Sequence, residues 1–395
     1  MQPIPNSIAA MAPELAEWRR DLHRHPELAF QEHRTAGIVA EKLRAWGFDT
    51  VETGIGGPGV VGVLHGRGGP GAPGGGDAIL LRADMDALPM PEETGLPHAS
   101  VNPGRMHACG HDGHTTMLLG AARHLAETRN FHGTVYFCFQ PAEEGRGGAQ
   151  AMIDDGLFER FPARAVYGMH NWPGAPAGTF AVRPGPIMAS ADEFTVTVRG
   201  SGGHAAFPHR AADPIVAGAQ IVTALQTIVA RKVDPLKPAV VSVTQFHAGS
   251  AMNVIPDEAK ICGTTRSFDA EVDALIRTEM RRVCDSVAAG LGVSATLATG
   301  EVPYPPTVND PAETAFAGQV LDALVGPERV DRERPPVMGG EDFSFMAQKR
   351  PGCFVLIGNG DTAPLHTRRY DFNDEVAPLG VAYWAKLVET ALPAG

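Results

Sequence analysis

The sequence has few cysteines, a deficit of positive charge and no long apolar run, and each shortage excludes a class of protein. Its five cysteines are odd in number, widely scattered and never arranged as CxxC, so a disulfide framework is not expected and a reducing compartment fits best. No apolar run reaches the roughly 18 residues of a membrane span, and the N-terminus lacks a basic start followed by an apolar core. We therefore expect a cytoplasmic protein.

Negative charge exceeds positive charge along the chain. Lys and Arg number 33 against 45 Asp and Glu, which gives a formal net charge of −12. A surface of this sign repels phosphate backbones and anionic lipids, so we expect neither nucleic acid nor a membrane as partner. With 395 residues, of which 44% are hydrophobic, the chain is long enough for two domains with real cores.

Short apolar runs alternate with helical patterns over much of the chain. The runs are bounded by Gly and Pro and lie at 60–64, 78–83, 133–139, 165–169 and 353–358. Their richness in Val, Ile and Phe is typical of strands buried on both faces, and a helical pattern at 113–128 lies between two of them. This alternation predicts an α/β fold with a mostly parallel or mixed sheet flanked by helices. The Gly-rich stretch 66–77 lacks GKS or GKT and is expected to be a surface turn between strands, not a phosphate loop.

A different pattern interrupts this α/β sequence. The segment EFTVTVRG at 193–200 alternates apolar and polar residues, as a half-solvated antiparallel strand does, and the α/β pattern returns after 303–310. We therefore expect a discontinuous α/β domain, 1–188 plus 302–395, interrupted by a smaller α+β domain at 189–301.

Polar residues follow several predicted strands at their carboxyl ends. These residues are Asp84, Asp86, Glu143, Glu144, His170 and His366, and the loop HACGHDGH adds Cys109, His111, Asp112 and His114. Sites in open α/β sheets lie in the crevice at the carboxyl ends of the strands, so these side chains are expected to converge there.

Thiolate, imidazole and carboxylate groups together form the ligand set that binds Zn²⁺, Mn²⁺, Co²⁺ or Ni²⁺. The cluster offers more groups than one tetrahedral ion requires, and a two-metal site with a bridging water, the ions roughly 3.5–4 Å apart, would use them all. In the pair Glu143-Glu144, one carboxylate can bind metal while its neighbour takes the proton of the attacking water. This division of labour indicates a metal-dependent hydrolase.

Two alternative hypotheses remain beside metal-dependent hydrolysis. Cys109 could be the nucleophile of a cysteine hydrolase with His111 as its base. A binding or assembly module that has kept the fold and lost the chemistry is the non-enzymatic alternative, although every chemically needed position is filled.

Several longer motifs occur in order along nearly the whole chain. They are LRADMDALPM at 81–90, HACGHDGHT at 107–115, QPAEEG at 140–145, GMHNWP at 168–173, SGGHAAFPH at 201–209, MNVIPD at 252–257, GTTRSFD at 263–269, GGEDFSF at 339–345 and LHTRRYDFND at 365–374. The set resembles the aminoacylase/carboxypeptidase superfamily of two-metal peptidases. More narrowly, it is similar to the hippurate hydrolase and indole-acetyl-amino-acid hydrolase branch, the N-acyl-amino-acid amidohydrolases.

The resemblance implies a role for each residue of the cluster. Glu143, the first acid of PAEE, would be the general base. Asp84 and Asp86 stand where other branches place a metal-binding His and its orienting Asp; with Asp at the first position, both are expected to orient the site. The implied metal ligands are Cys109, His111, Glu144, His170 and His366.

The inserted domain would be a lid that also forms a dimer in many relatives, and it would supply the substrate contacts. His204 resembles the histidine that stabilises the tetrahedral oxyanion, which in a dimer could act across the interface. Asn253 and Arg266 resemble the groups that hold the α-carboxylate of the amino acid, which the planar fork of Arg suits.

The expected reaction is hydrolysis of the amide bond of an N-acyl amino acid, such as hippurate, to a carboxylic acid and a free amino acid. The expected cofactors are two divalent ions, Mn²⁺ or Zn²⁺ with Co²⁺ or Ni²⁺ as alternatives, in a homo-oligomer, a dimer or tetramer. The enzymatic alternative is a metallo-dipeptidase or carboxypeptidase that acts on unblocked small peptides.

Overall fold

The computed structural model describes residues 4–67 and 77–394, and most of the Gly-rich stretch 66–77 lies outside them. The chain divides into two compact units. The first unit comprises Met1–Ile187, Val308–Pro335 and Asp342–Gly395, and the second comprises Met188–Thr307 and Pro336–Glu341. The short segment Pro336–Glu341 thus groups with the second unit, although it lies far from that unit in the sequence.

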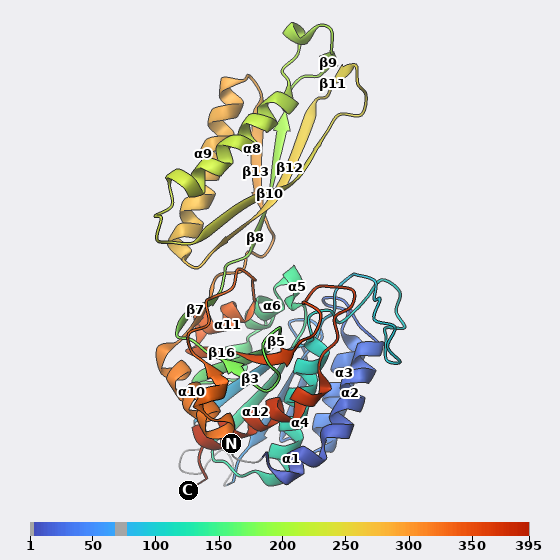
Figure 1. Ribbon diagram of the computed structural model, residues 1–395, viewed down its shortest axis with the longest axis vertical. Coiled ribbons are helices and arrows are strands. Elements are labelled where there is room, and N and C mark those ends of the chain that lie inside the picture. Colours follow the sequence, from blue (N-terminus) through green and yellow to red (C-terminus); the bar gives the residue numbers. More distant parts are fainter. Residues whose placement is uncertain (1–3, 68–76, 395) are drawn as a thin grey trace. The chain divides into compact units, whose positions relative to one another are not determined.

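An eight-stranded mixed sheet forms the centre of the first unit (Figure 1). In spatial order its strands are β1 (Thr50–Ile55), β2 (Gly59–His65), β4 (Thr134–Gln140), β3 (Ala78–Asp84), β5 (Ala165–Pro173), β16 (Gly352–Gly360), β6 (Phe180–Ala181) and β15 (Val330–Asp331). The central strands β4, β3, β5 and β16 are parallel to one another, whereas β2 runs antiparallel to β4. The five predicted apolar runs lie in β2, β3, β4, β5 and β16, so the predicted α/β class is confirmed.

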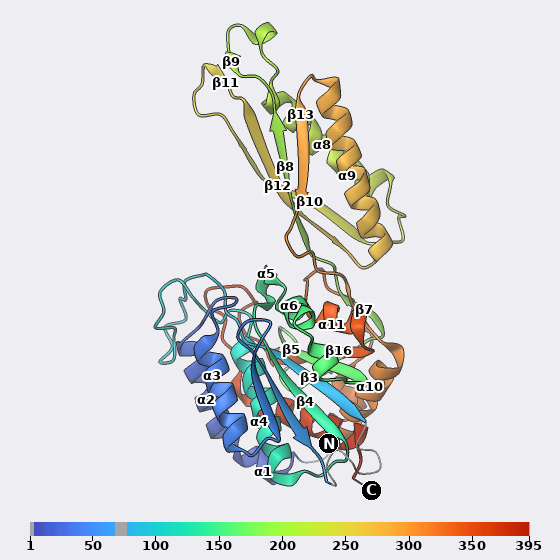
Figure 2. The ribbon, with the colours of Figure 1, turned by 180° about the vertical axis from the view of Figure 1, so that it is seen from behind.

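Helices cover both faces of this sheet because its strands are apolar on both sides. Alternate residues of β4 show this: Phe137 packs into the core that includes Leu118 of α4, whereas Sγ of Cys138 lies 3.8 Å from Sδ of Met152 in α6. The helices of this unit are α1 (Asn6–Ala10), α2 (Ala12–Arg24), α3 (His33–Ala45), α4 (His111–Thr128), α5 (Glu143–Arg146), α6 (Gly148–Asp154), α7 (Leu157–Arg160), α10 (Pro311–Val325), α11 (Phe343–Lys349) and α12 (Ala377–Ala391). Figure 2 shows the same sheet from behind, with α6 and α11 beside it. The carboxyl ends of the parallel strands are left for loops, and the candidate site lies there.

The second unit is an antiparallel sheet with two long helices on one face. Its strand order is β10 (Ala239–Ala248), β12 (Glu258–Ser267), β8 (Asp192–Arg199) and β13 (Ser294–Thr299), and the helices are α8 (Pro214–Arg231) and α9 (Ala270–Gly290). Alternate residues of β8 and β12 are buried, as the period-two pattern predicted for 193–200. A two-stranded ladder, β9 (Gly203–His204) with β11 (Val254–Ile255), completes the unit.

Among the residues that the structure describes, α8 is the one helix long and apolar enough to cross a membrane by length and composition. Its buried positions include Ala217, Ile221, Leu225 and Ile228, which recur every three or four residues and belong to the core of the second unit. Core helices of soluble proteins have the same length and apolar composition, so the expected lack of a membrane partner stays a prediction.

Candidate metal centre

The structure brings the predicted ligands together at the carboxyl ends of the parallel strands. Asp84 ends β3, and Glu143 and Glu144 follow β4 in the next turn. His170 lies in the last part of β5, and His366 follows β16. Cys109 and His111 enter from the start of α4. Because β3, β4, β5 and β16 are parallel, their carboxyl ends share one edge, and residues far apart in sequence meet there.

Three overlapping sets of side chains with open ligand atoms could each hold an ion. A further set, Asp84, His111 and His114, shares His111 with them, but hydrogen bonds engage its Asp84 and His114. Within each set the ligand atoms lie within 4.8 Å of one another. The first three sets are Cys109, His111 and His170; Cys109, Glu144 and His366; and His111, Glu143 and Glu144. Cys109 joins the first two, since its Sγ lies 3.4 Å from Nε2 of His170 and 3.3 Å from Nε2 of His366. Overlapping sets that share ligands are the arrangement that a two-metal site requires.

His111 presents an open nitrogen to this cluster. Its Nδ1 lies 3.2 Å from Oδ1 of Asp86, which fixes the ring, and its buried Nε2 has no hydrogen-bond partner among the described residues. Burial disfavours the imidazolium, but the carboxylates of Asp84 and Asp86 outweigh burial and raise the pKa of His111 to about 10. The surroundings of this ring are therefore strongly anionic and suited to a cation.

His170, from strand β5, and His366, from the loop after β16, complete the imidazole set. Nδ1 of His170 donates to the carbonyl of Asn171 over 2.6 Å, and burial holds the pKa of His170 well below its usual range, so the ring is neutral as a ligand must be. His366 is exposed and adopts a left-handed φ of 59°. Its backbone N–H donates to the carbonyl of Ala108 over 2.8 Å. Such backbone strain in a non-glycine residue persists only where the surroundings impose it, and it is common at functional sites.

Asp86 holds the turn that carries the two glutamates. Its two carboxylate oxygens accept the backbone N–H groups of Glu143 and Glu144 over 3.0 Å and 2.9 Å. The residue before this pair, Ala142, has a left-handed φ of 55°. Asp86 thus fixes His111 and both acidic residues at once, which is the orienting position that the resemblance implied for it.

Asp84 is committed to neighbouring side chains. Its Oδ2 accepts from Nη1 of Arg82 over 2.7 Å and its Oδ1 lies 2.6 Å from Nδ1 of His114. Burial raises the pKa of this carboxyl, but His111 and Arg82 outweigh burial and hold the pKa well below its usual range. Both oxygens are engaged within the protein, which fits an orienting group better than a metal ligand.

The structure shows the hydrogen bonds of His114, a residue for which the sequence predicts no role. It lies one turn after His111 on α4, and its Nε2 accepts the backbone N–H of Asn171 over 2.9 Å. Since both ring nitrogens are occupied, His114 is not open to an ion. Its spacing of three residues from His111 could have indicated a shared helix face, but not which of the two rings stays open.

The protonation state of the Cys109 thiol tests the hypothesis that this residue is the nucleophile of a cysteine hydrolase. Burial and the carboxylates of Glu144 and Glu143 raise the pKa of its thiol well above the usual range. A catalytic cysteine needs the opposite shift, because the thiolate is the nucleophile. A divalent cation would stabilise the thiolate, so the residues present fit a metal better than a cysteine nucleophile. The buried Nε2 of His111, which has no hydrogen-bond partner among the described residues, agrees with this fit.

The three predicted substrate-binding residues belong to the second unit. His204 and Asn253 are neighbours at the β9–β11 ladder, where the carbonyl of Asn253 accepts the N–H of Ala205 over 3.0 Å. Nδ1 of His204 accepts the N–H of Ala206 over 3.1 Å, which leaves the exposed Nε2 as the N–H donor. Arg266 lies near the far end of β12 and lines a separate hollow, so this unit does not bring it to His204.

Comparisons with known proteins agree with this chemistry. Residues 80–390 match Peptidase family M20/M25/M40. The chain is 42% identical to the hippurate hydrolase of Campylobacter jejuni over 388 residues, 98% of each chain. It is 38% identical to thermostable carboxypeptidase 1 of Saccharolobus solfataricus over 396 residues, also 98% of each. A solved structure, the YXEP protein of Bacillus subtilis, described as a dinuclear metal-binding peptidase of family M20, has a TM-score of 0.81 at 36% identity and covers 97% of this chain and 99% of its own.

Proposed function

Because the chain belongs to Peptidase family M20/M25/M40 and, within it, to the hippurate hydrolase branch, we propose that it hydrolyses the amide bond of N-acyl amino acids. The products are a carboxylic acid and a free amino acid. One observation carries the proposal: two ligand sets share His111, whose buried Nε2 is open, and a third set is joined to them through Cys109 and Glu144.

Two divalent ions suit this ligand set, and we assign Mn²⁺ or Zn²⁺, with Co²⁺ or Ni²⁺ as alternatives. When bound, such ions lower the pKa of a coordinated water and polarise the acyl carbonyl. The residues that would hold them are Cys109, His111, Glu144, His170 and His366.

Glu143 is assigned as the general base. It is almost fully buried, and its Oε1 lies 3.4 Å from the backbone N–H of Asp342, while its Oε2 lies 4.0 Å from Nε2 of His111. Oε2 is therefore the oxygen nearer to the ligand cluster, and it takes the proton of the attacking water. The same oxygen then gives this proton to the nitrogen of the leaving amine.

The second unit is assigned to substrate binding. The outward Nε2–H of His204 is a donor suited to the oxyanion that forms at the acyl carbon. Asn253 and Arg266 are assigned to the α-carboxylate, and the half-buried guanidinium of Arg266 suits such a group. Since His204 and Arg266 lie at separate places in one unit, a homo-oligomer in which His204 serves a neighbouring subunit would reconcile the two roles.

The proposal includes the domain organisation and the oligomeric state. We assign residues 1–188 and 302–395 to a catalytic domain and residues 189–301 to a lid and dimerisation domain. A cytoplasmic homodimer or homotetramer is the state that we expect.

Cleavage of unblocked peptides is a second candidate activity, supported by the similarity to a carboxypeptidase over nearly the whole chain. The pocket for the group beyond the scissile bond separates the two activities. An acyl cap requires an apolar or neutral lining there, whereas a free amino terminus requires an anionic partner.

Release of free amino acid tests the function. Hippurate, N-acetyl amino acids and unblocked dipeptides are incubated with the protein as purified, after EDTA, and after Mn²⁺, Zn²⁺ or Co²⁺ is restored. We expect release from the capped substrates that EDTA abolishes and metal restores. Cleavage of dipeptides alone would assign the protein to the peptidase activity, and activity that persists after confirmed metal loss would refute the metal mechanism.

A further inference from the structure

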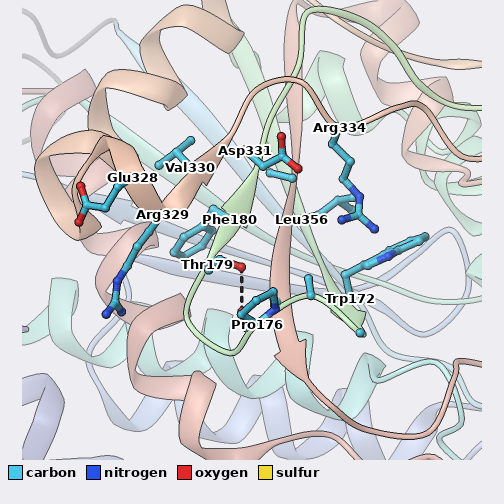
Figure 3. Close-up of a pocket in the computed structure, with 14 residues that line it drawn as sticks. Trp172, Pro176, Thr179, Phe180, Glu328, Arg329, Val330, Asp331, Arg334 and Leu356 are labelled. Atoms are coloured by element: carbon cyan, nitrogen blue, oxygen red, sulfur yellow. Dashed lines mark hydrogen bonds between the residues drawn. The ribbon is translucent and has the colours of Figure 1, made fainter.

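A separate pocket lies in the first unit where β6 and β15 meet the end of β5 (Figure 3). Its volume is about 290 Å³, and it opens between the turn 174–179, β16 and the loop that follows β15. Trp172, Phe180 and Leu356 give it apolar walls. None of its lining residues is assigned to the hydrolytic reaction.

Arg334 is half-buried and lines this pocket, and its side chain has no hydrogen bond or ion pair with any of the described residues. Its Cζ lies 5.1 Å from the centroid of the Trp172 ring, and its Nε is buried with no hydrogen-bond partner among the described residues. A cation–π contact with the indole favours this position of the guanidinium but uses none of its N–H donors. A buried N–H donor such as this Nε is costly unless an acceptor reaches it, so the pocket suits an acceptor from outside the chain.

The other charged residues near the pocket do not fill this role, and the exposed Glu328 lies on the side away from Arg334 (Figure 3). Asp331 uses Oδ1 to accept the N–H of Glu333 over 2.9 Å. Arg329 is an exposed lining residue, and Figure 3 shows it extending away from Trp172. Arg183 adds a second positive charge beside the loop, because its Nη1 donates to the carbonyl of Arg334 over 3.0 Å and its buried Nε also lacks a partner among the described residues.

We infer that this pocket binds a small monocarboxylate with an apolar body. The planar fork of Arg334 receives the carboxylate through two parallel N–H bonds, and Trp172, Phe180 and Leu356 pack against the body. The volume suits a single aromatic ring or a similar aliphatic group. Two sources share this chemistry, a simple carboxylic acid and an amino acid, and both are products of the proposed hydrolysis.

The test uses metal-free full-length protein, so that carboxylates cannot bind at the metal centre and the result does not depend on turnover. Benzoate and L-phenylalanine are titrated separately by calorimetry, with benzyl alcohol as the ligand that lacks a carboxylate. We expect saturable binding of benzoate, of phenylalanine or of both, and none of benzyl alcohol. Benzoate binding alone assigns the pocket to carboxylic acids, whereas phenylalanine binding alone shows that the amino group is also read.

Variants locate the binding site. Arg334→Ala is expected to weaken binding by roughly tenfold or more, because the charge-assisted bonds are lost. Arg329→Ala, which removes the arginine on the other side of the pocket, should bind as the wild type does. Arg334→Lys keeps the charge without the fork and should recover binding only in part. Trp172→Phe should abolish any ligand-induced change in tryptophan fluorescence while calorimetry still detects binding. Absence of saturable binding to the folded wild type, or equal affinity in Arg334→Ala, would overturn the inference.

Discussion

The backbone N–H of Asn171 donates to Nε2 of His114 over 2.9 Å, and this bond joins the helix that carries His111 to the strand that carries His170. The amide of the Asn171 side chain lies 3.0 Å from the same nitrogen and donates over 2.7 Å to the carbonyl of Cys109. One histidine and one asparagine therefore connect the segment that carries Cys109 and His111 to the strand that carries His170.

Loss of His114 should loosen the metal centre without removing a ligand. His114→Ala leaves the buried N–H of Asn171 and one oxygen of Asp84 unsatisfied, so we expect metal affinity to fall by about 10–100-fold. Competition with a chromogenic chelator measures this affinity. His124→Asn, on the same helix but away from the site carboxylates, is the control and should keep wild-type affinity. Unchanged affinity in His114→Ala would show that the bond to Asn171 does not support the ligands.

The buried guanidinium of Arg82 should be essential for stability. It donates to Asp84 over 2.7 Å, to Gln140 over 2.7 Å and to Asp342 over 2.9 Å, all in the interior. Arg82→Met leaves two buried carboxylates without their cation, so we expect a loss of about 3–5 kcal/mol in the free energy of unfolding by urea.

Arg164 supplies the matched control for this measurement. Its ion pair with Asp77 has a similar distance, 2.7 Å, but both side chains are 42% exposed. Arg164→Met should therefore change the free energy of unfolding by less than about 1 kcal/mol. Equal effects of the two substitutions would mean that Arg82 does not balance the charges of Asp84 and Asp342.

Cysteine labelling separates a metal ligand from a nucleophile. Cys109 is nearly buried and has a raised thiol pKa, whereas Cys262 is half-buried. In metal-free protein at pH 8, iodoacetamide should modify Cys262 before Cys109, as peptide mass spectrometry would show. Rapid modification of Cys109 near neutral pH would instead indicate a reactive thiolate and support the cysteine hydrolase alternative.

Stability should fall at alkaline pH through His23. Burial disfavours its imidazolium, but Asp112 at 2.8 Å and Glu92 at 3.4 Å outweigh burial and raise the pKa of His23 to about 9. Because the folded state favours the protonated form of His23, this residue contributes its full stabilisation below the unfolded-state pKa of 6.5. That stabilisation is lost as pH rises through about 9. The contribution is on the order of 3 kcal/mol.

Urea unfolding of metal-free protein between pH 6 and pH 10 measures this effect. We expect the difference in unfolding free energy between wild type and His23→Asn to shrink across that range. His33→Asn replaces an exposed histidine and should give a constant difference. A difference between wild type and His23→Asn that is independent of pH would contradict the charged state of His23.

The sequence predicts the sheet well because buried parallel strands are almost wholly apolar. All seven residues of β3 are buried, so the run at 78–83 could be recognised without knowledge of its neighbours. The acidic residues that follow such runs could likewise be expected at one edge of the sheet. By contrast, the six residues Pro336–Glu341 have no periodic pattern, and their grouping with the second unit could not be foreseen.

The hydrogen-bonding of the site could not be read from residue types. His111 and His114 lie one turn apart on α4, and only the N–H of Asn171, from a strand far away in sequence, decides that His114 is occupied and His111 open. The pocket at Arg334 was missed for a similar reason. Its walls come from separate segments, and an arginine in a loop gives no signal that its side chain will stack on Trp172.

The role of Glu143 is central to the proposed hydrolysis, and a single variant tests it most directly. Glu143→Gln keeps the shape of the side chain but cannot accept the proton of water, so turnover of hippurate should fall by at least about 10²-fold. Metal content, measured on the same sample by mass spectrometry, should stay at the wild-type value, whereas Glu144→Gln should lose metal. Full turnover by a metal-replete Glu143→Gln enzyme would contradict the assignment of Glu143 as the general base.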